Sequence, residues 1–83
     1  MYLTNLPLGS KGRVVKLTAK GKKRRRLLDL GLIPGTVVEA IRRSPSGDPT
    51  AYIIRGTVLA LRSEETNFIE VEELTQRRDI LWA

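Results

Sequence analysis

The sequence predicts a mainly β protein, a small closed or nearly closed antiparallel barrel of five strands with one short α-helix between the first and second strands. Two observations lead to this fold class. Five short apolar-rich runs are separated every few positions by turn-forming residues. Helical spacing over more than one turn occurs only between the first two runs. With 83 residues, 41% of them apolar, the chain is long enough for one domain with a modest core.

The first elements are predicted to be a tucked turn and a strand. Residues 3–9 contain three leucines, which we expect to cover one end of the core. Residues 13–18 form an apolar-rich run bounded by Gly12 and Gly21, a pattern typical of a strand.

The helix is predicted over residues 22–30, where leucines form one narrow apolar stripe on an otherwise charged surface. Gly31 should end it, because glycine adopts the left-handed conformation that a helix end favours. Pro34 and Gly35 suit the two central positions of a type II turn, with Gly35 taking the positive φ. This segment therefore joins a helix to the next strand through two tight turns.

The second strand is predicted over residues 36–43, with Val38 and Ala40 facing inward. Val37 and Ile41 are apolar on the opposite face, so this strand is either covered on both faces or interrupted by a bulge. The later elements are a hairpin loop at 44–49, strands at 51–55 and 58–62, a helical turn at 63–67 and a strand at 68–72. We expect the domain to span residues 1–74, followed by a docked or flexible tail at 75–83.

Composition excludes most catalytic chemistry. The chain has no cysteine and no histidine, so disulfides, structural zinc sites, iron–sulfur clusters and imidazole bases are excluded within it. The serines at 44, 46 and 63 lack a base and fit turns. We therefore expect no enzyme activity, no catalytic residue and no cofactor.

Metal binding rests on carboxylates alone. The candidate ligands are Glu64, Glu65, Glu70, Glu72 and Glu73. Oxygen ligands favour magnesium, calcium or manganese, and a tight ferrous site normally recruits imidazole. We assign no metal-binding residue.

No apolar run approaches the roughly 20 residues that span a bilayer, and residues 1–7 lack the features of a signal peptide. We expect a soluble, cytoplasmic protein without direct membrane insertion.

The net charge of +6 is unevenly distributed, because nine basic residues precede the first acid, Asp29. Residues 22–26 (KKRRR) are either a docking patch for an acidic partner or a solvated helix face. We place Arg24, Arg25 and Arg26 among the candidate partner-binding residues, and note that Arg25 and Asp29 have the spacing of a helical ion pair.

The same charge raises an alternative function, a basic β-barrel that binds nucleic acid. Single-strand binders stack bases on aromatic platforms, and no two of the four aromatic residues share a predicted strand face. We therefore expect no nucleic-acid partner and keep this function as the alternative.

Apolar residues supply the other candidates for partner binding. Leu8, Leu32 and Ile33 are either an exposed apolar groove for a partner segment or ordinary core residues. Leu32 lies beside a turn, where a lone apolar side chain is often exposed, whereas Ile33 is expected in the core. Leu81 and Trp82 lie in the tail, and Trp82 is predicted either to fold back on the barrel or to insert into another molecule. The tail is therefore a candidate contact for a homo-oligomer.

Four motifs, in order, resemble the FeoA family (ferrous iron transport protein A). Residues 26–36 (RLLDLGLIPGT) closely resemble its signature, and residues 44–49 (SPSGDP) look like its Pro-x-Gly-Asp-Pro loop. Arg55-Gly56 and residues 59–65 (LALRSEE) are similar to its corner and its fourth strand. The resemblance covers residues 3–74, and the tail lies beyond it.

The resemblance implies an SH3-like barrel and a small accessory role in bacterial ferrous iron uptake. It also implies a partner, the iron permease with its cytosolic G-protein domain, which would place the chain at the inner membrane as a peripheral protein. The same module occurs fused to iron-dependent repressors, and since no DNA-binding helix pair precedes it here, we expect the free-standing form. We do not transfer proline-rich peptide binding, because the chain is too poor in aromatic residues for that groove.

Overall fold

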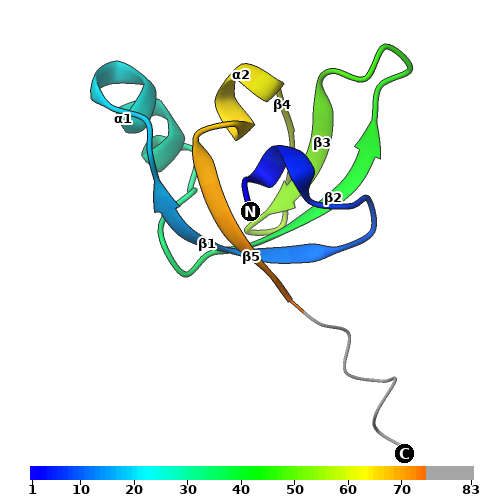
Figure 1. Cartoon of the computed structure of the whole chain (residues 1–83), viewed down its shortest axis with the longest axis horizontal. Helices are drawn as coiled ribbons and strands as arrows, with labels where there is room; N and C mark the ends of the chain where they lie inside the picture. The colour runs from blue at the N-terminus through cyan, green and yellow to red at the C-terminus, as the bar shows by residue number, and fades with distance from the viewer. Residues whose placement is uncertain (75–83) are drawn as a thin grey trace, which may run out of the picture.

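The computed structural model describes residues 1–74, which form one curled antiparallel sheet with the strand order β4-β3-β2-β1-β5 (Figure 1). The elements in chain order are a 3₁₀ turn η1 (Leu3–Asn5), β1 (Lys11–Leu17), α1 (Gly21–Asp29), β2 (Val37–Arg43), β3 (Thr50–Ile54), β4 (Thr57–Leu61), α2 (Ser63–Thr66) and β5 (Ile69–Leu74). The predicted five-stranded barrel with a helix between the first two strands is confirmed. Within the described residues no ladder joins β4 to β5, so the barrel is open at that seam.

Two register shifts bend the sheet. One falls between Val14 and Lys16 where β1 pairs with β5, and the other between Ala40 and Arg42 where β2 pairs with β3. A bulged residue increases the local bend and twist of a strand. Of the two predicted alternatives for β2, the bulge is therefore the one observed.

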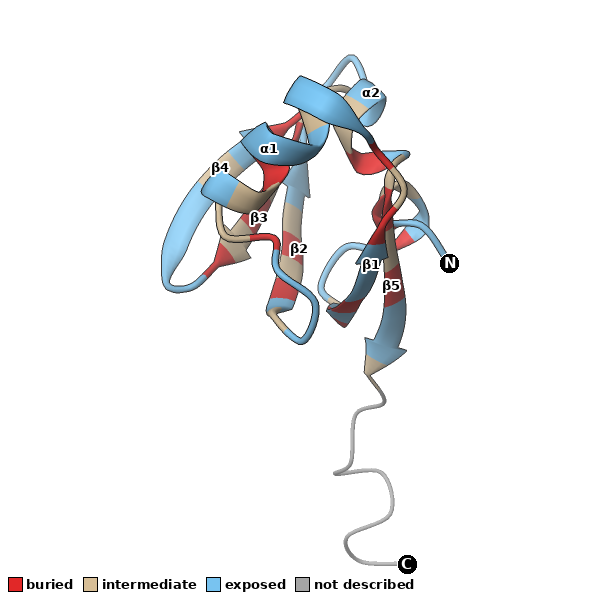
Figure 2. Ribbon diagram, turned by 90° about the vertical axis from the view of Figure 1, so that its left-hand side faces the viewer, coloured by how far each residue is buried: buried red, intermediate tan, exposed pale blue. Residues whose placement is uncertain are grey.

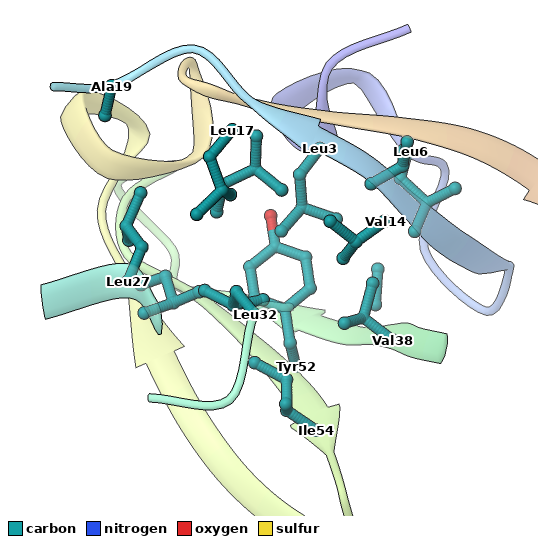
Figure 3. Close-up of a cluster of buried hydrophobic side chains, with 14 residues drawn as sticks. Leu3, Leu6, Val14, Leu17, Ala19, Leu27, Leu32, Val38, Tyr52 and Ile54 are labelled. Atoms are coloured by element: carbon teal, nitrogen blue, oxygen red, sulfur yellow. The ribbon is translucent and has the colours of Figure 1, made fainter. Parts of the chain in front are cut away.

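The core lies inside the curled sheet, and η1 covers part of it (Figures 2 and 3). Inward-facing strand residues such as Val14, Val38 and Tyr52 are buried, together with Leu3 and Leu6 from the N-terminal turn. Val38 and Ala40 face inward as predicted. Leu8 is instead exposed, so only two of the three N-terminal leucines cover the core.

Helix α1 ends in a Schellman motif. The Leu32 amide donates to the Leu27 carbonyl (3.1 Å) and the Gly31 amide to the Leu28 carbonyl (2.9 Å). Gly31 has a φ of +97°, which glycine adopts without the penalty that a Cβ atom would add. The predicted stop at Gly31 is confirmed, and the helix itself lies one residue earlier at each end than predicted.

The turn into β2 also has the predicted form. Thr36 donates its amide proton to the Ile33 carbonyl (2.9 Å), and Gly35, in the third position, has a φ of +96°. A type II turn requires a positive φ there.

The assignments of Leu32 and Ile33 were wrong. Leu32 is completely buried, whereas Ile33 is 42% exposed. The Schellman motif reverses the chain, so the residue after Gly31 returns over Leu27 and packs into the core with it. Leu32 is therefore a core residue and is withdrawn from the candidate binding surface.

Gly12 was also misassigned, because it lies inside β1 and does not bound it. A Cβ atom placed there would lie 3.3 Å from the Val71 side chain on β5. The missing side chain allows β1 and β5 to pack closely.

No helix among residues 1–74 is long and apolar enough to cross a membrane.

Candidate functional site

The basic face of α1, which we define as residues 22–26, lies at one end of the barrel and is largely exposed (Figure 2). The helix carries these residues because only its leucine stripe, centred on the buried Leu27, packs against the core. Four of the five basic side chains are on the exposed side, and Lys23 is half-buried.

Three residues of the basic face contact their own domain. Lys23 donates to the Glu64 carbonyl (3.2 Å) and its Nζ lies 4.3 Å from the centroid of the Phe68 ring, a cation–π contact. Arg24 donates through Nη1 to the Leu17 carbonyl (3.2 Å). Arg26 pairs with Glu65 at 2.6 Å between Nε and Oε2, and this hydrogen bond and the Glu65 charge raise the pKa of Arg26.

The side chains of the other two residues, Lys22 and Arg25, make no hydrogen bond or ion pair with the described part of the chain. The predicted pair of Arg25 with Asp29 is not formed. The basic run was interpreted either as a docking patch for an acidic partner or as a helix face, and different residues of the run take different roles. Arg24 and Arg26 support the fold, and Arg25 and Lys22 are the cations left facing solvent.

A polar pocket that the sequence analysis missed lies between the 44–49 loop and α2. It is lined by Thr4, Arg43, Asp48, Thr50, Tyr52 and Thr66. Asp48 accepts a hydrogen bond from the Ser63 amide (2.9 Å), so the loop is tied to the first residue of α2. The hydroxyl groups of Thr4 and Thr66 lie 2.6 Å apart. The sequence did carry one signal for this pocket: Thr50 and Tyr52 are two positions apart, so in a strand both face inward.

The serines hold turns together, as predicted. Ser44 and Ser46 both donate to the Asp48 carbonyl, at 2.7 and 3.0 Å. Ser63 is the first residue of α2.

Burial raises the pKa of Tyr52, and the hydroxyl groups of Thr50 and Thr66 offset part of this effect. Above pH 10 the unfolded chain therefore loses a phenol proton that the folded chain retains, so stability falls as pH rises. We expect thermal melts to show a larger loss of stability between pH 9 and pH 11 in the wild type than in Tyr52→Phe. Equal losses in the two proteins would contradict this assignment.

The candidate carboxylates are dispersed in the structure. Glu70 faces Lys16 (4.0 Å), Glu72 pairs with Arg13 (3.2 Å), and Glu65 is held by Arg26. Among residues 1–74 no three carboxylates gather in a way that would hold a metal ion.

Two candidate residues, Leu81 and Trp82, lie outside the described residues. Their roles in partner binding or in a homo-oligomer stay predictions, as does the division between a domain at 1–74 and a tail at 75–83.

The aromatic residues of the described part do not form a stacking platform. Tyr52 is buried in the core and Phe68 is half-buried beneath Lys23. Stacking on exposed rings is the usual means of holding single-stranded nucleic acid. Tyr2 is exposed, but it is a single ring. Aromatic stacking among residues 1–74 therefore gives no support to the nucleic-acid alternative, which rests on the basic charge alone.

The open, five-stranded barrel with a single helical turn before its last strand defines the chain as a small SH3-like domain whose exposed feature is a charged surface. The FeoA domain family model matches residues 1–73. The chain belongs to the FeoA family, which is associated with ferrous iron transport.

Comparisons with individual proteins agree with this family. The chain is 32% identical over 72 residues to a Porphyromonas gingivalis protein described as a fusion of Fe(2+) transport protein A with the Fe(2+) transporter FeoB. The match covers 87% of the chain but 8% of that relative's length.

Two solved structures are similar over most of both chains. A FeoA-like protein from Clostridium acetobutylicum has 33% identity and a TM-score of 0.86, with 94% of this chain and 91% of that one covered. FeoA of Stenotrophomonas maltophilia, solved with zinc and described as a prokaryotic SH3 domain protein, has 30% identity and a TM-score of 0.78, with 87% and 89% covered.

Proposed function

We propose that this protein is an accessory subunit of ferrous iron uptake that docks on the cytosolic part of the iron permease and regulates or assembles it. The observation that carries this proposal is the Porphyromonas gingivalis relative, in which the two proteins are one polypeptide. Fusion keeps two domains at a high effective concentration, an arrangement that favours partners that work in contact. The chain would then act at the cytoplasmic face of the membrane.

The mechanism would be a shift of equilibrium without covalent chemistry. A docked domain changes the balance between two conformations of its partner only as far as its affinities for them differ. If the partner's nucleotide cycle passes through both conformations, the same difference in affinity changes the populations along that cycle.

The solvent-facing cations of α1 are the proposed contact. Lys22 and Arg25 are exposed and keep their charge available, whereas Arg24 and Arg26 already bind groups of their own domain. Charges at the edge of an interface accelerate association with an oppositely charged surface and are screened by salt. The partner surface should accordingly be acidic.

The test is the affinity of the full chain for the purified cytosolic part of the permease. We expect Arg25→Glu to weaken binding about tenfold at low salt, and to do so less at physiological salt. Arg42→Glu is the matched control, since Arg42 is also exposed but lies on β2, away from α1 (Figure 1). Its affinity should change much less.

Two results together would overturn the proposal. The wild-type chain would fail to bind the permease, and deletion of the chain would leave ferrous iron uptake unchanged.

A further inference from the structure

The two edge strands of the sheet, β5 and β4, differ in whether another segment of the chain covers their outer edge. The outer edge of β5 is covered by the N-terminus, because Tyr2 forms a bridge to Glu70, the Val71 amide donates to the Met1 carbonyl (2.7 Å), and the Met1 amino group donates to the Val71 carbonyl (3.2 Å). The other end of the sheet, β4, pairs only with β3. No strand among residues 1–74 covers its outer edge.

The hairpin between β3 and β4 determines which backbone N–H and C=O groups of β4 are not hydrogen-bonded to β3. Arg55 and Gly56 both have positive φ, 54° and 78°, as in a two-residue type I′ turn. Ile54 and Thr57 therefore close the ladder as a hydrogen-bonded pair. Because hydrogen-bonded pairs alternate along an antiparallel ladder, Val58 and Ala60 direct their N–H and C=O groups away from β3. Neither has a backbone partner elsewhere in the described chain.

This edge lacks the usual protection. Edge strands commonly carry lysine, proline or another feature that prevents pairing with a further chain. The residues of β4 are Thr-Val-Leu-Ala-Leu, without charge or proline, and Val58 is 57% exposed.

Grooves beside this edge have α1 as their opposite wall. At one end of β4 the groove is lined by apolar side chains from the end of α1, the residues after it and β4, among them Leu28, Leu30 and Leu59. Asp29, Arg55 and Thr57 also line it. At the other end it is lined by Ala60, by the cations Lys22, Lys23, Arg26 and Arg62, and by Glu64 and Glu65. Arg26 pairs with Glu65 and Arg62 lies 3.9 Å from Asp48, so Lys22 and Lys23 are the cations left beside the single carboxylate of Glu64.

We propose that β4 accepts an extended, acidic segment of the permease's cytosolic part as a sixth strand. Backbone hydrogen bonds to Val58 and Ala60 would give affinity, and alternate side chains would enter the groove beside α1, as in other cases of strand addition. A second copy of this chain fits less well, because β4-to-β4 pairing would bring two basic rims together on molecules of net charge +6. This inference rests on the proposed function.

The test is Val58→Pro, compared with Val58→Thr. Proline removes the outward amide that the added strand needs, and an edge strand tolerates it when that amide faces solvent. Threonine keeps the amide and changes only the side chain. We expect Val58→Pro to bind the purified cytosolic part of the permease about tenfold more weakly, as for the loss of a hydrogen bond and its neighbours. Val58→Thr should bind within about twofold of the wild type.

A second measurement does not depend on how Val58→Pro folds. Hydrogen exchange of the Val58 and Ala60 amides in the wild-type chain should slow on addition of the permease fragment, because both become hydrogen-bonded.

The outcomes separate the two proposals. If the wild type does not bind the fragment, the added strand is overturned, and the proposed function is overturned with it when deletion of the chain also leaves ferrous iron uptake unchanged. If it binds, but Val58→Pro binds equally well or the two amides stay fast-exchanging, only the added strand is overturned. Self-association of the chain in sedimentation that is lost in Val58→Pro, without permease binding, would identify a second copy as the occupant and overturn this inference.

Discussion

Leu32→Ala is expected to lower the free energy of unfolding by about 2–5 kcal/mol, the range for removing a fully buried leucine side chain. Leu32 has no exposed surface and belongs to the core cluster with Leu27 and Ile54. In a domain of this size each kcal/mol shifts the melting temperature by roughly 4–8 °C. The variant should therefore melt roughly 8–40 °C below the wild type, and at the upper end of this range it would be unfolded at ambient temperature, because small domains have a thin margin of stability.

The adjacent residue provides the control. Ile33 has the same number of carbon atoms but is 42% exposed, so Ile33→Ala should lower the free energy of unfolding by about 1 kcal/mol or less. Urea titrations followed by circular dichroism measure both variants. Similar destabilisation by the two substitutions would show that the chain does not turn back into the core at Gly31.

Gly31→Val is expected to have the second largest effect, about 2 kcal/mol of destabilisation. Gly31 has a φ of +97°, where a β-branched residue is strained. The new Cβ would also lie 3.2 Å from Cδ of the Arg55 side chain, although a flexible arginine can move aside. Most of the effect should therefore come from the backbone.

Gly31→Asn separates the effect of backbone strain at positive φ from the effect of contact between the new side chain and Arg55. Asparagine also carries a Cβ atom but visits positive φ more readily, so its destabilisation should be about 1 kcal/mol. Thermal melts of the three proteins at one pH provide the comparison. If asparagine and valine destabilise equally, contact with Arg55 is the cause and the backbone argument fails.

The sequence predicted the elements that depend on local chemistry. Glycine at 31 and 35 and proline at 34 allow few backbone conformations, so the helix end and the turn into β2 were predicted correctly. Alternation predicted that Val38 and Ala40 face inward. These features follow from residues that are neighbours in the chain.

Predictions of whether a residue is buried or exposed, and of what it packs against, were less successful. Leu32 and Ile33 are adjacent and equally apolar, and the bonds of the Schellman motif decide which one enters the core. Gly12 looked like a boundary because its partner, Val71, is far away in sequence. The pocket around Tyr52 also joins residues from η1, β3 and α2, which only folding brings together.

The proposed binding surface was also predicted only in part from the sequence. The cluster of charges at 22–26 was visible in the sequence, but the partners of Arg24 and Arg26 lie on β1 and α2. Those contacts leave Lys22 and Arg25 as the cations directed to solvent. The free edge of β4 was also hidden, because an edge is a property of strand order.

By itself, the sequence determined the class of fold, the turns, the absence of thiol and imidazole chemistry, and the resemblance to the FeoA family. Each of these is fixed by residue type and local spacing. The tertiary structure decided which leucine is buried, which arginines are already bonded and which strand edge stays uncovered. These outcomes depend on contacts between distant segments, and no local pattern encodes such contacts.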